Sequence, residues 1–354
     1  IMEKLLYTPN KSKNGYNLWM AYPACKSFAL ASLGYMWLSK LAEEMSEINS
    51  VRVYTDSEVN SINPQAIAFS LSFDFDFMGV FEILEKNKIP FLSNERDENS
   101  PLIFAGGPVL TTNPEPYKKI FDFMIIGDGE VVLNKILDVL KRGMSKSEAL
   151  DALATIEGVY VPYKTKTVKK ITEPLNSVIY TPIISDECYF KDTFIVEVAR
   201  GCMNRCAFCT ASYLNLPFRN YEYEKIINAI DLGLKHTNKI ALLGAQISAH
   251  PDFNKICIYL NSSLIGGYNA RYIYKGSDIT REVRRSLRQS SVQLKAVKPE
   301  GAYEMVEDGY GEKAIFLALM NPDVKVVARI ADDDRRRIAE VAAEDFVDNI
   351  EFIA

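Results

Sequence analysis

Histidine is nearly absent from this chain. The 354 residues contain only His236 and His250, so the amino-terminal half has no histidine and can offer no histidine ligand to a metal. Cysteine is sparse as well, and six in a chain of this length do not indicate a disulfide framework. No apolar run is long enough to cross a membrane, and no signal peptide is visible. We therefore expect a cytoplasmic protein that makes no membrane contact.

The overall composition is ordinary for a globular protein. Apolar residues make up 48% of the chain and charged residues 25%, with a net charge of −5. This charge balance gives no global indication of nucleic-acid binding. The length is sufficient for two or three domains with sizeable cores.

Three cysteines follow a predicted strand near the middle of the chain. The apolar run Phe194–Val198 predicts a buried strand, which the breaker Arg200-Gly201 ends. Cys202, Cys206 and Cys209 then lie on one short loop, where three thiolates can converge on a single metal centre. A closed structural zinc site needs four ligands. A 4Fe-4S cluster held by three thiolates instead leaves one iron free to bind substrate.

The pattern Cys-x-x-x-Cys-x-aromatic-Cys after a strand resembles the signature of radical S-adenosylmethionine (SAM) enzymes. The resemblance implies that the three cysteines hold a 4Fe-4S cluster whose open iron binds SAM, and that SAM is cleaved reductively to a 5′-deoxyadenosyl radical. It also implies that Phe208, just before the third cysteine, lies near the adenine of SAM. The alternative is a structural zinc site completed by His236 or His250, and we prefer the cluster.

The segment after the cysteines continues in the same alternation. Tyr223–Leu234 predicts an amphipathic helix and Lys239–Leu243 a buried strand. Together with the strand before the cysteines, this is the opening of a (β/α) partial barrel. In radical SAM enzymes the second strand ends in a Gly-Gly-Glu-like stretch that contacts the SAM amino group. Gly244, Ala245 and Gln246 occupy that place here, although Gln246 offers a carbonyl acceptor without a carboxylate charge.

The amino-terminal half alternates predicted strands and helices. This alternation indicates an α/β fold with a doubly wound parallel sheet, in which ligands bind at the carboxyl ends of the strands. Those ends are the turns Ser70–Ser72, Ala105–Pro108 and Gly127–Glu130. The glycines in these turns are compatible with a ligand that approaches the backbone, and also with ordinary turn chemistry, which we favour for glycines alone.

The order of these turns resembles the cobalamin-binding-like domain that precedes the core in one large branch of radical SAM proteins. Cobalamin domains that ligate cobalt from below use Asp-x-His-x-x-Gly, and this half of the chain has no histidine. Either cobalamin binds without that ligand, or the domain has kept its fold and lost the vitamin. We favour the second alternative.

The last 90 residues depart from the expected pattern. The features of later barrel strands are missing, and arginine replaces lysine as the commoner cation. We therefore expect an incomplete barrel followed by a small α/β tail that includes a strand at Val324–Ile330 and a helix at Asp332–Ala343. Gly276–Thr280 and Asn321–Ile330 weakly resemble the later half of a nucleotide-sensing domain that regulates potassium transport.

These observations predict four regions. Residues 1–145 form the cobalamin-binding-like, Rossmann-like domain, and residues 146–190 a linker with a small β subdomain. Residues 191–264 form the first part of the radical SAM core, and residues 265–354 an α/β segment that is not part of that core. We expect a radical SAM enzyme with an unknown substrate and an electron donor such as ferredoxin or flavodoxin, impaired by its incomplete core. The rival is a ligand-sensing protein without catalysis, with structural zinc at the cysteines.

Overall fold

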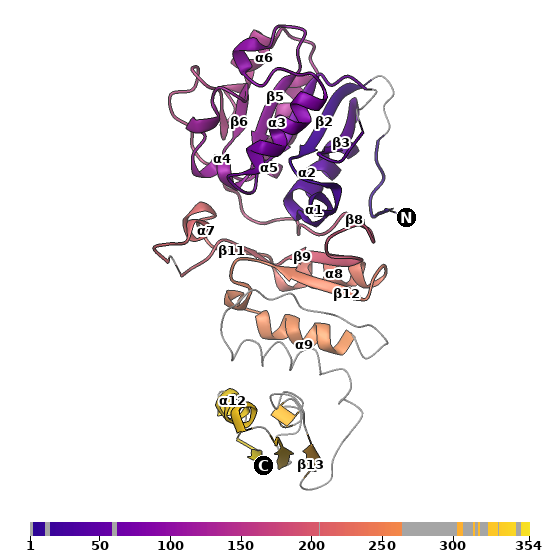
Figure 1. The fold of residues 1–354 in the computed structure, drawn as a ribbon, viewed down its shortest axis with the longest axis vertical. Coiled ribbons are helices and arrows are strands. Elements are labelled where there is room, and N and C mark those ends of the chain that lie inside the picture. The colour runs from indigo at the N-terminus through magenta and orange to yellow at the C-terminus, as the bar shows by residue number, and fades with distance from the viewer. Residues whose placement is uncertain are drawn as a thin grey trace. The chain divides into compact units, whose positions relative to one another are not determined.

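A computed structural model describes most of the chain. The described residues are 3–10, 15–58, 62–204, 206–263, 303–306, 314, 315, 318, 325–331, 333–344 and 348–354. The chain divides into two compact units (Figure 1). The first comprises Ile1–Tyr221 and Gly244–Gln246, and the second comprises Glu222–Leu243 and Ile247–Ala354.

A six-stranded sheet forms the centre of the first unit. Its strands are β2 (Tyr16–Tyr22), β3 (Ile48–Tyr54), β4 (Ala66–Ser70), β5 (Leu102–Gly106), β6 (Phe123–Ile125) and β7 (Val159–Tyr160). Their order is β3-β2-β4-β5-β6-β7, with only β7 antiparallel to its neighbour. The five parallel strands thus follow the flavodoxin-like order. The chain adds β3 on one side of β2 and all later parallel strands on the other side, so the switch point lies between β2 and β4. The predicted doubly wound parallel sheet is confirmed.

The side chains of the sheet alternate between two hydrophobic cores. Along β2, Leu18 and Met20 belong to one core, whereas Trp19 and Ala21 belong to the other. This follows from the two-residue period of a strand, which sends successive side chains to opposite faces. One core is covered by α1 (Lys26–Ala31), α2 (Leu33–Glu44), α5 (Gly129–Leu140) and α6 (Lys146–Leu153), and the other by α3 (Asp76–Lys86) and α4 (Pro108–Thr112).

Local sequence signals fix where two of these helices begin. The Ser145 side chain accepts a hydrogen bond from the backbone of Glu148, whose carboxylate reaches back to Ser145, a capping box at the start of α6. The Asp76 carboxylate accepts bonds from the backbone N–H groups of Ser72 and Phe73, at 2.6 and 2.9 Å. This second contact closes the turn between the carboxyl end of β4 and the start of α3.

The rest of the first unit leads to the cysteine-bearing segment. The strand predicted before the cysteines is present as β9 (Thr193–Glu197). Two very short antiparallel pairs flank the region, β1 (Lys4–Leu5) with β8 (Ile183–Ile184), and β10 (Ala199–Arg200) with β11 (Arg219–Asn220). The short helices along the chain are α7 (Thr210–Leu214) and the 3-10 turns Ser93–Glu95, Glu115–Tyr117 and Ile247–Ala249.

The second unit contains α8 (Tyr223–Leu234), β12 (Lys239–Leu243) and α9 (Phe253–Ser263). Near the carboxyl terminus, β13 (Tyr303–Val306), β14 (Val326–Arg329) and β15 (Ile350–Ile353) form a three-stranded parallel sheet in that order, accompanied by α12 (Asp333–Glu344). The expected α/β tail is thus present. Gly276–Thr280 lies outside the described residues, and within the described part of the chain no sheet closes into a barrel.

Candidate functional site

A cavity of about 320 Å³ lies at the carboxyl ends of the parallel strands. The three turns named from the sequence, around Ser70, Gly107 and Gly127, all border it. Aromatic side chains line much of its wall, namely those of Tyr35, Trp37, Phe69 and Phe104. The cavity therefore sits beside the switch point between β2 and β4, where ligands of open α/β sheets bind.

The glycines of two of these turns are required by the backbone around them. Gly107 has a φ of +116°, and a Cβ there would lie 2.3 Å from the carbonyl oxygen of Leu71. Gly127 has a φ of +110°, and its Cβ would lie 2.1 Å from the carbonyl oxygen of Ile171. Both glycines therefore serve the turns themselves, which agrees with the turn-chemistry interpretation.

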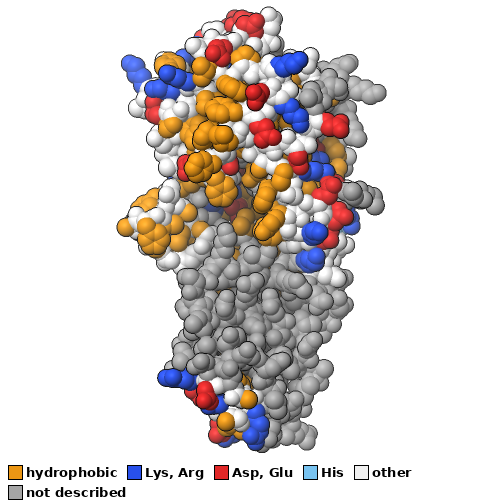
Figure 2. All heavy atoms as spheres, in the orientation of Figure 1, with side chains coloured by type: hydrophobic (Ala, Val, Ile, Leu, Met, Phe, Trp, Pro, Cys, Tyr) orange, Lys and Arg blue, Asp and Glu red, His pale blue; other side chains and the backbone are white. Residues whose placement is uncertain are grey.

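Apolar side chains are also exposed next to the cavity. Figure 2 shows such side chains grouped on one face of the sheet domain. Phe73, Phe75 and Met78, just after the cavity-lining Ser72, are 71%, 81% and 60% exposed. A contiguous exposed apolar surface is typical of an interaction site. This end of the sheet thus presents both a cavity and an apolar rim.

The three cysteines lie on a loop whose two arms meet at a narrow neck. The neck is the β10–β11 ladder, in which Ala199 pairs with Asn220 and Arg200 with Arg219. Gly201 follows with a φ of +89°, and a Cβ there would lie 2.5 Å from the carbonyl oxygen of Asn215. The arms are therefore too close for any other residue at position 201, which explains the Arg-Gly step before the cysteines.

The thiols of the loop have unequal surroundings. All three are free of disulfides. Cys202 is 9% exposed and its sulfur lies 3.4 Å from Oε1 of Gln246, whereas Cys206 and Cys209 are partly exposed. The side chain and backbone N–H of Ser212, close to the sulfur, lower the pKa of the Cys209 thiol. A lower pKa favours the thiolate, which is the form that binds metals.

The structure brings one of the predicted SAM contacts to the cysteine loop. Gln246 joins the loop through Cys202, and its Nε2 also donates to Oδ1 of Asn204 at 3.4 Å. Gly244 and Ala245 belong to the same turn and the same compact unit. The ring of Phe208 is 90% exposed on the loop itself. The turn at 244–246 therefore contacts the cysteine loop through Gln246.

The donor set of this loop suits an iron–sulfur cluster. It offers three reduced thiols within eight residues and no fourth protein ligand on the loop. Among the described residues, no three His, Cys, Asp or Glu side chains are gathered closely enough to hold a metal ion. Cluster binding would therefore require the loop to bring its sulfurs together. His250 is 3% exposed and its Nδ1 accepts the backbone N–H of Asp252, as expected of a structural turn residue.

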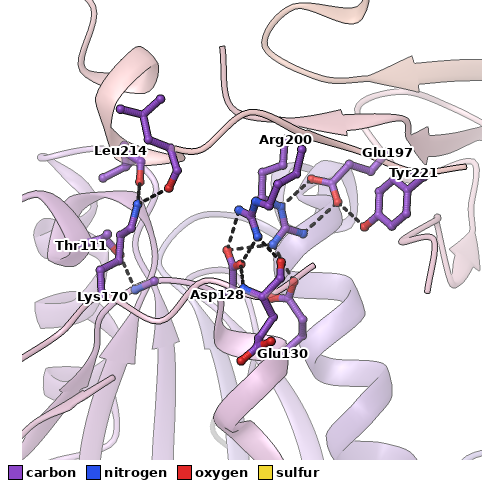
Figure 3. A network of polar contacts seen from close by, with 12 residues as sticks. Thr111, Asp128, Glu130, Lys170, Glu197, Arg200, Leu214 and Tyr221 are labelled. Atoms are coloured by element: carbon purple, nitrogen blue, oxygen red, sulfur yellow. Dashed lines mark hydrogen bonds and ion pairs between the residues drawn. The ribbon is translucent and has the colours of Figure 1, made fainter. Parts of the chain in front are cut away.

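A cluster of buried charges lies where the cysteine loop meets the sheet (Figure 3). Arg200 donates from Nη1 to Asp128 and Glu130, at 2.9 and 2.6 Å, and from Nη2 to Glu197 at 2.8 Å. Its side chain is only 13% exposed. Arg219, opposite Arg200 in the ladder, also bonds to Asp128, at 2.5 Å. Asp128 thus joins both arms of the neck to the carboxyl end of β6.

The charges in this cluster stabilise one another. Burial alone would raise the pKa of Asp128, but Arg219 and Arg200 more than offset it and lower the pKa. Burial and the carboxylate of Glu197 raise the pKa of Tyr221, whose hydroxyl donates to Glu197 at 2.8 Å. Asp128 is therefore ionised and Tyr221 protonated at neutral pH. In these states Asp128 can accept hydrogen bonds from both arginines, and Tyr221 can donate one to Glu197.

Sequence reasoning named the turn that contains Asp128 and Glu130 but missed their partners. Arg200 was interpreted only as part of a breaker, and Arg219 drew no interpretation. Asp128 and Arg200 are 72 positions apart, and no local pattern pairs them. The sequence does offer one signal. Glu197 lies three residues before Arg200, so an oppositely charged pair directly precedes the cysteine motif.

Residues 26–162 match the family model described as "Radical SAM proteins, N-terminal". This match supports a protein of the radical SAM family. It covers most of the sheet domain and none of the cysteine loop. The chain is also 25% identical over 301 residues to an uncharacterised protein of Methanocaldococcus jannaschii, an alignment that covers 82% of this chain and 62% of the relative.

The chain thus spans less than two thirds of that relative's length. Within the described residues, no helix is long and apolar enough to cross a membrane.

Proposed function

We propose that this chain is a radical SAM protein in which Cys202, Cys206 and Cys209 hold a 4Fe-4S cluster. The observation that carries the proposal is the built cysteine loop, which is closed at its neck and contacted by the Gln246 turn. The family match of the preceding sheet domain supports it independently. When bound, the cluster and SAM would supply a 5′-deoxyadenosyl radical that removes a hydrogen atom from the substrate.

The residues around the thiols have separate roles in this proposal. Three thiolates leave one iron without a protein ligand, which is the position that SAM needs. Phe208 and the turn Gly244–Gln246 would contact SAM. The ring of Phe208 would lie near the adenine, and Gln246 would accept a hydrogen bond. A one-electron donor of the ferredoxin or flavodoxin class would supply the electron that the cluster chemistry needs. The substrate and the hydrogen-abstraction partner are not assigned.

Two observations support a sheet domain that has kept its fold without cobalamin. No histidine precedes His236, so none can ligate cobalt from below. The cavity of about 320 Å³ is near the lower end of the range for drug-sized ligands, about 300–1,000 Å³, and a corrin with its appendages is larger than those. We therefore propose residues 1–145 as a cobalamin-like domain without the vitamin.

The carboxyl-terminal strands bear on how active the site can be. Among the described residues, β13, β14 and β15 pair only with one another. We propose that residues 265–354 do not complete the core begun by residues 191–264, with residues 146–190 as the linker.

A SAM site that stays open should bind SAM weakly, because ligand sites bury most of the ligand surface. Little 5′-deoxyadenosine should then form under dithionite, and a rate comparable to that of complete radical SAM enzymes would contradict this.

Metal analysis of anaerobically purified protein tests the proposed function. We expect iron and acid-labile sulfide in equal amounts, with the brown colour and broad absorption near 400 nm that are generic for such clusters. Zinc without sulfide would contradict the proposal and favour a structural zinc site in a ligand-sensing protein.

A further inference from the structure

Three cations hold the cysteine loop at its neck, and two of them, Arg200 and Arg219, reach from the loop to Asp128. Besides Arg200 and Arg219, Lys170 donates from Nζ to the carbonyl oxygens of Leu214 and Leu216, at 3.0 and 2.8 Å. Figure 3 shows Lys170 beside Leu214 and Arg200 beside Asp128. The outgoing arm is thus fixed by Arg200 and the returning arm by Arg219 and Lys170.

Arg200 is the most constrained member of this group. Its three guanidinium nitrogens make four hydrogen bonds to three carboxylates, including Nε to Glu197 at 3.1 Å. The planar guanidinium group of arginine holds its N–H donors in fixed directions that match carboxylate oxygens, whereas the ammonium group of lysine does not. Only Gly201 separates it from Cys202. The direction in which the chain enters the cysteine loop therefore depends on where this guanidinium is held.

Stability alone is a weak explanation for so many charges in a buried place. Taking carboxylates and guanidinium groups out of water is costly, and well-packed apolar side chains often stabilise a fold as much. What a buried charge cluster does supply is a single geometry, because each bond is lost if the partners shift. That property matters where a loop must present sulfurs in one arrangement.

We propose that Arg200 is a positioning residue for the cysteine loop. Through its bonds to Asp128, Glu130 and Glu197 it fixes the backbone that leads into Cys202, so cluster retention depends on a residue that touches neither iron nor sulfide. The inference rests on the proposed function for its cluster readout, but the placement of Cys202 can be measured in the cluster-free protein.

The test compares Arg200→Lys and Asp128→Asn with a matched control, Arg52→Lys. Arg52 lies in the same unit, is 17% exposed, and bonds to Glu3 and Glu43 at 3.0 and 3.1 Å. All three variants lose a buried arginine–carboxylate contact, but only the first two lose one at the neck. Any effect shared by all three is therefore general destabilisation.

The first readout is alkylation of cysteines in the cluster-free protein, followed by mass spectrometry. Cys202 and Cys188 are both buried, at 9% and 7% exposure, so Cys188 reports general opening of the unit. In Arg200→Lys and Asp128→Asn we expect Cys202 to react roughly tenfold faster, since the lost bonds to charged groups are strong enough for that change. Cys188 should react at its wild-type rate, and Arg52→Lys should leave Cys202 unchanged.

The second readout is resistance of the reconstituted cluster to an iron chelator. In both neck variants we expect cluster loss at about tenfold lower chelator concentration, the usual scale for changes in groups that orient metal ligands. The effect of the double variant should be smaller than the two single effects combined, because both changes remove the shared Arg200–Asp128 contact.

The outcomes separate the two proposals. If wild-type protein takes up no iron, the proposed function fails, and the alkylation comparison still decides the role of Arg200. Wild-type reactivity of Cys202 in both neck variants would overturn the positioning role, even in a protein that holds its cluster. So would equal acceleration of Cys202 and Cys188.

Discussion

At the scale of single residues, the cysteines of the loop are not equivalent. Cys202 is buried and contacts Gln246, whereas Cys206 and Cys209 are partly exposed. The buried thiol is therefore tied to the protein scaffold, and the other two have room to move toward it. Cys206, between the other two, is the most informative position to change.

Replacing Cys206 with Ala should lower the iron content of reconstituted protein by about tenfold, because two thiolates cannot hold the cube stably. Iron and sulfide analysis after desalting measures this. The matched control is Cys25→Ala, which removes a partly buried thiol outside the loop and should leave iron unchanged. Full iron retention in Cys206→Ala would remove this cysteine from the ligand set.

Replacing Gly107 with Ala should destabilise the sheet domain by about 2 kcal/mol, since its φ of +116° and the Leu71 carbonyl both oppose a side chain. Gly34→Ala is the control, because Gly34 lies in α2 with nothing within 4 Å of an added Cβ. That change should stabilise by up to about 1 kcal/mol. Urea unfolding compares the two, and equal effects would show that the turn is not strained.

The residues that could be predicted were those with a local signature. The cysteine spacing, the aromatic at Phe208 and the glycine turns are visible in a short window of sequence. Arg200, Arg219 and Lys170 were not, because their importance lies in contacts with residues far along the chain. The tight fit of Gly201 against Asn215 was also hidden until the arms of the loop were seen together.

At the scale of elements, the very short ladder of β10 and β11 has a disproportionate role. Two residue pairs close a loop of 18 residues, and such a short ladder is marginal without support from side chains. The support comes from Asp128 at the end of β6. The strand and its turn could be predicted from their apolar run and glycines, whereas the ladder could not, because two residues carry no periodic pattern.

The pH dependence of stability should reveal this support. The pKa of Asp128 is lowered in the folded protein, so its ionised form stabilises the fold at pH values above about 3.9, the ordinary pKa of Asp. We expect Asp128→Asn to be less stable than wild type by about 3 kcal/mol at pH 7. The difference should shrink as the pH falls below about 4, when the wild-type carboxyl takes up its proton. A constant difference in urea unfolding from pH 7 to pH 3 would show that the carboxylate charge is unimportant.

At the scale of the whole molecule, the sheet domain is predictable and the tail is only partly so. Alternating apolar segments were enough to predict the doubly wound sheet, because the inner strands β4, β5 and β6 are buried on both faces. The small α/β segment at the carboxyl end was also expected, and its three strands are parallel. Residues 264–302 lie outside the described residues, so the prediction of an incomplete barrel stays a prediction there.

Titration with hydroxocobalamin tests the proposal for the sheet domain. We expect no binding, or a bound form without nitrogen ligation from below, because no histidine precedes His236. The absorption spectrum of the cobalamin reports both binding and ligation. Spectral evidence of a histidine ligand from residues 1–185 would refute the prediction.

The most direct test of the central claim is electron paramagnetic resonance of anaerobically reconstituted protein after reduction with dithionite. We predict the signal of a reduced 4Fe-4S cluster in the wild type and its loss when Cys202, Cys206 and Cys209 are all replaced by Ala. An absent signal in folded wild-type protein, or an undiminished signal in the triple variant, would contradict the assignment of the cluster to these three cysteines.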